Sequence, residues 1–396
     1  MKILHLVNTF AAIGGVETYV LKLLPLLTER GHENVVVYRQ AHARTPVVPD
    51  ATVFHVPVTA VPAQGRAQVL DIIRQERPSI IYMHDVYDPE LIAQAARLAP
   101  SVGYVHIFYP VCPGLGKLYR QGDVVCERPY GLGCVPQIYL RRCASARDPR
   151  SVYRIMQQTG RYLAAYRTLP RIVVGTAYMK ALLIQNGVAS ERIDILPPHF
   201  VTDVSDEPLS RPDESPPNIL FAGRLAYEKG IPYLLQASQR IKAPHRLLIA
   251  GDGDLKESYQ RLAAELGIAD RVEFLGWLDN QALDAAYRRS AVAAMPTIMP
   301  EPFGKVGIEA LTNGRPVVAF NVGGIADWLQ DGVNGYLVPP RDIARLAARL
   351  ERLLTDVDLA MELGRNGRAF VRQQYQPQAH ADRLTQIFET VVLNGR

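Results

Sequence analysis

The stretch Pro296–Gly324, PTIMPEPFGKVGIEALTNGRPVVAFNVGG, decides how the second half of the chain folds. A Pro-Phe-Gly turn leads into a helical segment, an apolar run at Pro316–Phe320 predicts a buried strand, and a Gly-Gly turn follows. Two carboxylates, Glu301 and Glu309, stand with seven residues between them. We expect the first on the loop before the helix and the second about two turns inside it.

The start of that helix predicts a binding site for an anionic, oxygen-rich ligand. Backbone amides at Phe303, Gly304 and Lys305 have no intrahelical acceptor, and the helix dipole favours negative charge there. Carboxylates such as Glu301 and Glu309 accept hydrogen bonds from paired hydroxyls. Together these groups suit a polyhydroxylated, phosphorylated ligand. The alternative is a helix N-terminus that carries two solvated acids.

Strands and helices alternate on both sides of this stretch, which predicts an α/β protein with parallel, doubly wound sheets. Helical periodicity is clearest from Val16 to Arg30. The predicted strands are Lys2–Asn8, Val35–Tyr38, Val53–Val56, Ile80–His84, Val102–Ile107, Ile172–Gly175 and Ile193–Leu196 in the first half, and Asn218–Ala222, His245–Gly251, Val272–Leu275, Ala291–Met295, Pro316–Phe320 and Gly335–Val338 in the second. We therefore expect two Rossmann-like domains that face each other across a cleft.

Composition places the domain boundaries. Residues 1–202 are predicted to form an N-terminal domain, which is interrupted at 109–143 by a Gly/Pro/Cys-rich insertion. Residues 203–217 are acidic and rich in Pro and Ser, as is typical of a linker. Residues 218–375 are predicted to form a C-terminal domain. Residues 376–396 are expected to form a helix that packs back on the first domain.

Charge and hydropathy narrow the class of partner. A net charge of +5 and a pI near 8.9 are compatible with anionic small substrates or a membrane surface and are too weak to indicate nucleic acid. We find neither a signal-peptide pattern nor an apolar run of membrane-spanning length, so we expect a cytoplasmic protein. Tyr139–Arg171 has eight arginines against one acid, Asp148, which predicts either a solvated helix face or a surface for an anionic acceptor or for lipid headgroups at the inner membrane face.

Four cysteines gather in the insertion: Cys112, Cys126, Cys134 and Cys143. Their spacing lacks the C-x2-C pair that makes a zinc site recognisable from sequence. A structural metal (zinc or an iron–sulfur cluster), disulfides and buried thiols are the alternatives, and a reducing compartment favours the metal over disulfides.

Three further strings carry residues suited to a phosphorylated ligand. Gly14-Gly15 lies where the first strand meets the first helix, and glycines there let the backbone approach a phosphate. The string Phe221–Gly230, FAGRLAYEKG, places Gly223, Arg224 and Lys229 just past a strand, where a guanidinium and an ammonium suit a pyrophosphate. His106 ends a strand of the first half, and His84 and Asp85 end the preceding one.

The strings IGGVETYV, GRLAYEKG and EPFGKVGIEA together resemble retaining glycosyltransferases of the two-Rossmann-domain (GT-B) type, family 4. The resemblance implies that Glu309 binds ribose hydroxyls, Glu301 and His106 contact the donor sugar, and the Gly15 amide, Gly223, Arg224, Lys229 and the amides of Phe303, Gly304 and Lys305 hold the donor diphosphate region. It also implies that the N-terminal domain holds the acceptor and that the C-terminal domain holds the nucleotide-sugar donor. His84 and Asp85 are candidates for acceptor contact. The Cys-rich insertion and Lys305 depart from the family pattern and leave the sugar and the acceptor open.

The implied reaction is transfer of a sugar from a UDP- or GDP-sugar to a hydroxyl of a glycan, glycolipid or small molecule. No D-x-D stands at a strand end, so no catalytic metal or other cofactor is expected, and any metal would be structural, at the cysteines. The competing functions are a GT-B epimerase, a phosphorylase that uses pyridoxal phosphate, and a silent nucleotide-sugar-binding protein. A dehydrogenase is excluded by the missing G-x-G-x-x-G fingerprint.

Overall fold

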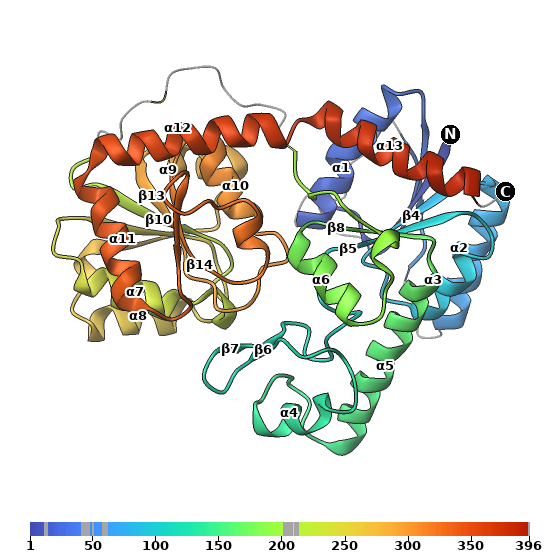
Figure 1. The fold of residues 1–396 in the computed structure, drawn as a ribbon, viewed down its shortest axis with the longest axis horizontal. Helices are drawn as coiled ribbons and strands as arrows, with labels where there is room; N and C mark the ends of the chain where they lie inside the picture. The colour runs from blue at the N-terminus through green and yellow to red at the C-terminus, as the bar shows by residue number, and fades with distance from the viewer. Residues whose placement is uncertain are drawn as a thin grey trace. The chain divides into compact units, whose positions relative to one another are not determined.

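The computed structural model describes residues 1–11, 15–40, 48–49, 51–57, 62–200, 209 and 214–394. The chain forms two compact units (Figure 1). The first comprises Met1–Lys117, Glu127–Phe200 and Pro377–Arg396, and the second comprises Leu118–Cys126 and Val201–Gln376. The predicted linker at 203–217 lies largely outside the described residues, which include only Leu209 and residues 214–217 of it.

The first unit is built on a parallel sheet with the order β3-β2-β1-β4-β5-β8-β9 in its described part. Its central strands are buried along their whole length, as expected when helices cover both faces of a sheet. The strands are β1 (Lys2–Thr9), β2 (Glu33–Gln40), β3 (Ala51–His55), β4 (Ile80–His84), β5 (Ser101–Val105), β8 (Arg171–Val174) and β9 (Ile193–Ile195).

Three helices of the first unit begin at capping side chains. Asp88, Asp148 and Thr176 each accept a hydrogen bond from the first turn of the helix that follows. The C-terminal helix lies beside α1 (Figure 1), and the Tyr19 hydroxyl is 2.9 Å from His380 Nε2. The helices are α1 (Gly15–Thr28), α2 (Pro62–Glu76), α3 (Pro89–Ala95), α4 (Cys134–Leu140), α5 (Pro149–Thr168), α6 (Ala177–Gln185), the 3-10 helix η1 (Ser190–Arg192) and α13 (Pro377–Asn394).

The insertion at 109–143 is divided between the two units. Its middle forms a hairpin of β6 (Leu118–Tyr119) and β7 (Val124–Val125), which belongs to the second unit. The hairpin thus departs from the predicted domain boundaries, which place the whole of 109–143 in the N-terminal domain. The reason is hydrophobic: Leu118 is buried in the core of the second unit, and Val125 packs against that core.

The second unit repeats the parallel architecture with the order β12-β11-β10-β13-β14-β15, the arrangement typical of Rossmann folds. Its strands are β10 (Asn218–Ala222), β11 (Arg246–Ala250), β12 (Val272–Gly276), β13 (Ser290–Met295), β14 (Val317–Phe320) and β15 (Gly335–Val338). Its helices are η2 (Tyr227–Lys229), α7 (Ile231–Arg240), α8 (Lys256–Glu265), η3 (Ala269–Arg271), α9 (Asn280–Arg288), α10 (Lys305–Thr312), η4 (Gly324–Asp327), α11 (Ile343–Thr355) and α12 (Val357–Gln374).

The two parallel sheets confirm the α/β prediction of two Rossmann-like folds. Within the residues that the structure describes, none of the helices is both long enough and apolar enough to cross a membrane.

Candidate functional site

Loops at the carboxyl ends of β10 and β11 are joined closely in the second unit. The Gly223 amide donates to the Ala250 carbonyl at 2.9 Å, and the Leu225 amide donates to the Asp252 carbonyl at 2.9 Å. Gly251 adopts φ 139°, and a side chain there would collide with the Gly223 carbonyl. Glycine is therefore required where these two loops approach, and the FAGRLAYEKG string starts from a rigid base.

Each cation of the predicted site is paired with a carboxylate. Arg224 Nη2 lies 2.5 Å from Glu228 Oε1. Lys229 Nζ lies 2.6 Å from Glu301 Oε1, and Lys305 Nζ lies 3.1 Å from Glu309 Oε1. The two glutamates of the E-x7-E string thus each hold a lysine. Sequence reasoning missed Glu228, although its spacing of four residues from Arg224 is the usual spacing of a helical ion pair.

Backbone contacts hold Glu301 in place. Its carbonyl accepts from the Gly324 amide at 2.7 Å, and a bridge pairs Glu301 with Gly323. Gly323 has φ 64°, and a side chain there would lie 2.5 Å from the backbone of Glu301. The Glu301 carboxylate is therefore presented by a tight crossing of two loops, and only 9% of the residue is exposed.

The FAGRLAYEKG and EPFG strings also contact each other through Glu228. Its carbonyl oxygen accepts from Thr297 Oγ1 and from the Ile298 amide, both at 3.0 Å. The turn that carries Lys229 is consequently joined to the loop that carries Glu301, and the ion pair between those two residues lies within one connected framework.

Helix α10 begins as the sequence predicted, without a side-chain cap. Its N-cap residue Gly304 is left-handed at φ 88°, and Lys305 is the first helical residue. Phe303 is buried, and its carbonyl accepts from Trp328 Nε1 at 2.7 Å. The first turn of α10 is thus not taken up by a capping side chain, and its dipole favours an anion.

The first unit contributes a different set of groups at the ends of β4 and β5. His106 is buried, its ring stacks on Tyr104 at 3.8 Å between centroids, and its Nε2 lies 3.5 Å from His84 Nδ1. Burial lowers the pKa of His106 to about 3 and also lowers the pKa of His84. Both imidazoles are therefore neutral near pH 7.

Asp85 lies beside this histidine pair with a left-handed backbone at φ 44°. Its Oδ1 accepts from the His106 amide at 3.4 Å, and burial raises its pKa to about 7. His84 is wholly buried, and its acceptor contact stays a prediction. Gly15 is exposed at the start of α1, with open space where a side chain would be, whereas Gly14 lies outside the described residues.

The predicted site residues therefore fall into two groups, one in each unit. Gly15 and His106 belong to the first unit. The second unit holds Gly223, Arg224, Lys229, Glu301, Phe303, Gly304, Lys305 and Glu309, all at or after the carboxyl ends of β10 and β13. Ligands of parallel α/β sheets bind at such strand ends.

The four cysteines are divided between the two units. Cys126 belongs to the second unit and the other three to the first. All four lie in the described part of the chain, where no disulfide joins them. Among the same described residues, no group of three or more His, Cys, Asp or Glu is placed to hold a metal ion.

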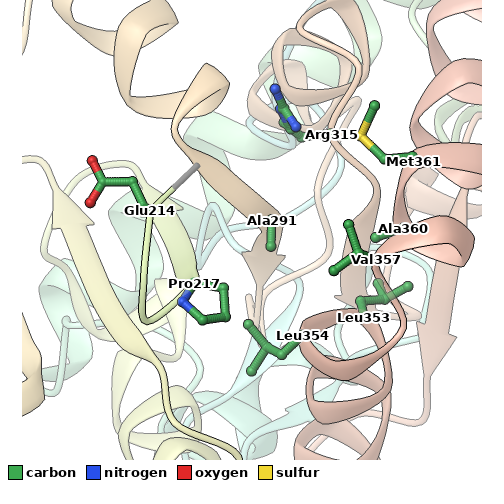
Figure 2. A pocket seen from close by; sticks show the side chains of 9 residues that line it. All are labelled: Glu214, Pro217, Ala291, Arg315, Leu353, Leu354, Val357, Ala360 and Met361. Atoms are coloured by element: carbon green, nitrogen blue, oxygen red, sulfur yellow. The ribbon is translucent and has the colours of Figure 1, made fainter. Parts of the chain in front are cut away.

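A cavity of about 180 Å³ lies elsewhere in the second unit (Figure 2). Pro217 precedes β10, Ala291 is the second residue of β13 and Arg315 precedes β14. The cavity is therefore at the amino ends of these strands. Its remaining lining is mainly apolar, from α11 and α12. It is thus separate from the carboxyl-end residues described above.

Two family models match consecutive parts of the chain. The model described as Glycosyltransferase Family 4 matches residues 13–204, and the model described as Glycosyl transferases group 1 matches residues 206–370. The boundary between the two matches falls in the predicted linker.

Individual relatives agree with these models. Uncharacterized glycosyltransferase MJ1607 of Methanocaldococcus jannaschii is 36% identical over 40% of this chain and 40% of that protein, so the match spans less than half of the relative. A D-inositol 3-phosphate glycosyltransferase of Nocardia farcinica is 31% identical over 89% of this chain and 79% of that protein. The crystal structure of Anabaena Alr3699/HepE in complex with UDP and glucose has a TM-score of 0.72 at 19% identity, covers 98% of this chain and 100% of that chain, and shows the same fold. The chain belongs to the glycosyltransferases of family 4, which have the two-domain GT-B fold.

Proposed function

We propose that this protein is a retaining glycosyltransferase that moves a sugar from a UDP- or GDP-sugar to an acceptor hydroxyl without a required metal. The observation that carries the proposal is the trio of ion pairs at the carboxyl ends of β10 and β13, because it combines cations for a diphosphate with carboxylates for hydroxyls. A UDP complex of a protein with the same fold supports this donor class.

In this proposal the second unit holds the donor. Arg224 and Lys229 offset the charge that grows on the diphosphate as the bond between sugar and phosphate breaks. Glu309 accepts from ribose hydroxyls, and Glu301 accepts from hydroxyls of the sugar. Because Lys229 already contacts Glu301, the same lysine joins the sugar-binding carboxylate to the phosphate-binding cations.

The first unit contributes the Gly15 amide to the diphosphate and His106 to the donor sugar. A neutral imidazole with a pKa near 3 serves as a hydrogen-bonding group rather than a general acid. The acceptor hydroxyl attacks the anomeric carbon on the face that the diphosphate leaves. Its proton passes to a diphosphate oxygen, and the new bond keeps the anomeric configuration.

A ligand screen tests the donor class first. Thermal shift with UDP, GDP and their sugars should show stabilisation by one base, since a ligand at 100 times its dissociation constant adds about 2.7 kcal/mol. Incubation with donor and candidate acceptors, followed by NMR of the product, then reads the anomeric configuration. An inverted product would contradict retention, and a new nucleotide sugar formed without an acceptor would indicate an epimerase. An absorbance band of bound pyridoxal phosphate would indicate a phosphorylase, and tight donor binding without turnover would indicate a silent binder.

Metal independence is tested in the same assay. Turnover should survive EDTA over minutes, and a parallel melting curve shows whether the fold is also intact. A rate that collapses and returns with Mg²⁺ or Mn²⁺ would mean that a metal takes part in catalysis.

We further propose that the first unit contacts an anionic membrane surface through α4. Ile138 faces the small core that α4 shares with α5, while Leu132, in the turn before α4, and Leu140, the last residue of α4, are 88% and 67% exposed. Four arginines that follow in the chain are exposed and make no ion pair among the described residues: Arg141, Arg142, Arg150 and Arg154. Exposed leucines in a segment rich in exposed arginines match a lipid interface, where each arginine contributes about 1 kcal/mol.

Vesicle sedimentation tests this contact. Leu132→Ser with Leu140→Ser, and separately Arg141→Gln with Arg142→Gln, should reduce binding to phosphatidylglycerol-containing vesicles. Arg161→Gln is the matched control, because Arg161 already pairs with Glu90. Equal binding to neutral vesicles would show that the arginine charges do not contribute to membrane binding. A dimer that the leucine variant abolishes would instead indicate a second copy on this face.

A further inference from the structure

The β6–β7 hairpin is the part of the insertion that belongs to the second unit. Leu118 pairs with Val125 and Tyr119 with Val124 across the antiparallel strands. At its tip, Arg341 Nη1 of the second unit donates to the Gly122 carbonyl at 2.5 Å. The hairpin is thus held both by apolar burial at its base and by a charged donor at its tip.

Asp123 carries the most specific contact of the hairpin. One carboxylate oxygen accepts from the Tyr227 hydroxyl, and the other accepts from the Tyr233 hydroxyl at 2.6 Å. The Arg120 guanidinium lies 5.8 Å from the centre of the Tyr227 ring. A carboxylate that receives two hydroxyl donors makes stronger hydrogen bonds than a neutral acceptor would. Burial and this carboxylate together raise the pKa of Tyr227 to about 12, so the hydroxyl stays a donor.

Tyr227 is the first residue of the turn that carries the donor-site charges. The 3-10 helix η2 contains Tyr227, Glu228 and Lys229 and has no side-chain cap of its own. Glu228 pairs with Arg224, and Lys229 pairs with Glu301. A single 3-10 turn has weak internal hydrogen bonding. Contacts from outside the turn therefore determine where its side chains point.

We propose that Asp123 is a positioning residue of the donor site, which acts through Tyr227 to set the turn that carries Glu228 and Lys229. The inference rests on the proposed function, because it makes a hairpin outside the family strings part of the diphosphate site. Tyr233 offers an internal comparison: it binds the same carboxylate from α7, outside the turn.

Calorimetry with UDP tests the proposal through three variants. Asp123→Ala should raise the dissociation constant of UDP about tenfold, and Tyr227→Phe should do nearly the same, since either change breaks the hydrogen bond that holds the turn. Tyr233→Phe should change it by about twofold or less. Adding Asp123→Ala to Tyr227→Phe should have little further effect. Equal changes in the two tyrosine variants, or no change in Asp123→Ala, would overturn the proposal.

Amine labelling in the absence of ligand separates this inference from the proposed function. With an amine-reactive reagent and mass spectrometry, the labelling rate of Lys229 should rise severalfold in Asp123→Ala and Tyr227→Phe. Lys305, whose partner Glu309 lies on α10, should keep its rate. If the wild type binds neither UDP nor GDP, the proposed function fails while this comparison still decides the role of Asp123. An unchanged Lys229, or parallel rises at Lys229 and Lys305 that indicate general loosening, would overturn it.

Discussion

The two units share a strand order but present opposite chemistry at the carboxyl ends of their strands. In the first unit these ends carry His84, Asp85 and His106, buried among aromatic rings and with pKa values shifted toward the neutral forms. In the second unit they carry partly exposed ion pairs, among them Lys229–Glu301 and Lys305–Glu309. The same topology therefore supports either an uncharged site or a charged one.

The difference follows from solvation. A charge removed from water without a partner is costly, so buried groups in the first unit remain neutral. In the second unit each cation of the candidate site has a carboxylate beside it. This pairing limits the cost of removing the charges from water and leaves both groups ionised. Under the proposed function, an incoming diphosphate would meet cations that are already held in place by Glu301 and Glu309 or by Glu228.

The largest expected effect is the loss of turnover when a cation of the second unit is removed. Lys229→Ala should lower turnover at saturating donor by roughly 10²–10³, because it removes a charge that stabilises the departing diphosphate. Arg224→Ala should fall in the same range. Turnover is measured as release of the nucleoside diphosphate, with far-UV circular dichroism to verify the fold. Rates near wild type in both variants would show that the charged ends are not the chemical site.

Acid should unfold the first unit before the second, because the first unit holds buried, neutral histidines. Burial lowers the pKa values of His106 and His380 to about 3 and of His5 to about 4. Their stabilising contribution is complete above about pH 6.5 and is lost as the pH falls toward 3 or 4, at roughly 1 kcal/mol or more per histidine and pH unit. Asp85, whose pKa burial raises to about 7, acts in the opposite direction: its contribution is complete below about pH 4 and is lost as the pH rises toward 7.

The two tryptophans permit this test, because Trp277 and Trp328 both belong to the second unit. Melting curves at pH 7.5 and 4.5 are followed by tryptophan fluorescence and by far-UV circular dichroism. At pH 4.5 the dichroism should show a transition at lower temperature that the fluorescence does not. Coincident transitions that shift together would mean that the units do not differ in acid stability.

Glu309 and Glu301 should bind different parts of the donor, the nucleotide and the sugar respectively. Glu309→Ala should weaken binding of free UDP by about 1.5–3 kcal/mol, the range of a hydrogen bond to a charged group. Glu301→Ala should leave free UDP nearly unaffected and weaken the intact nucleotide sugar. Calorimetry with both ligands separates the roles, and the reverse order for free UDP would show that they are misassigned.

The smallest effect concerns the pair that the sequence did not predict. Glu228→Gln removes the partner of the largely exposed Arg224 and should strengthen UDP binding about twofold, because exposed pairs contribute only a few tenths of a kcal/mol. Glu257→Gln, which removes the exposed partner of Arg261 on α8, is the control and should have no effect. Weaker UDP binding in Glu228→Gln would mean that Glu228 orients Arg224 rather than competes for it.

Local sequence patterns predicted most of the secondary structure and the positions of the site residues relative to strand and helix ends. Apolar runs such as Ile80–His84 became strands because a fully buried parallel strand needs apolar residues on both faces. The run Asn218–Ala222 and the string after it placed Arg224 and Lys229 past a strand end, where the structure has them. The uncapped start of the helix after Gly304 also followed from the sequence.

Contacts between distant segments decided the rest. The pairing of Lys229 with Glu301 joins loops that are 72 residues apart, and the contact of Asp123 with Tyr227 joins segments 104 residues apart. The complete burial of His84 and the transfer of the β6–β7 hairpin to the second unit likewise depend on what packs around each segment. Residue type and spacing determined which chemical groups the strand ends carry, because strand and helix periodicity are local. Only the tertiary structure decided which groups are paired and which are buried, because pairing and solvation depend on neighbours that the local sequence does not name.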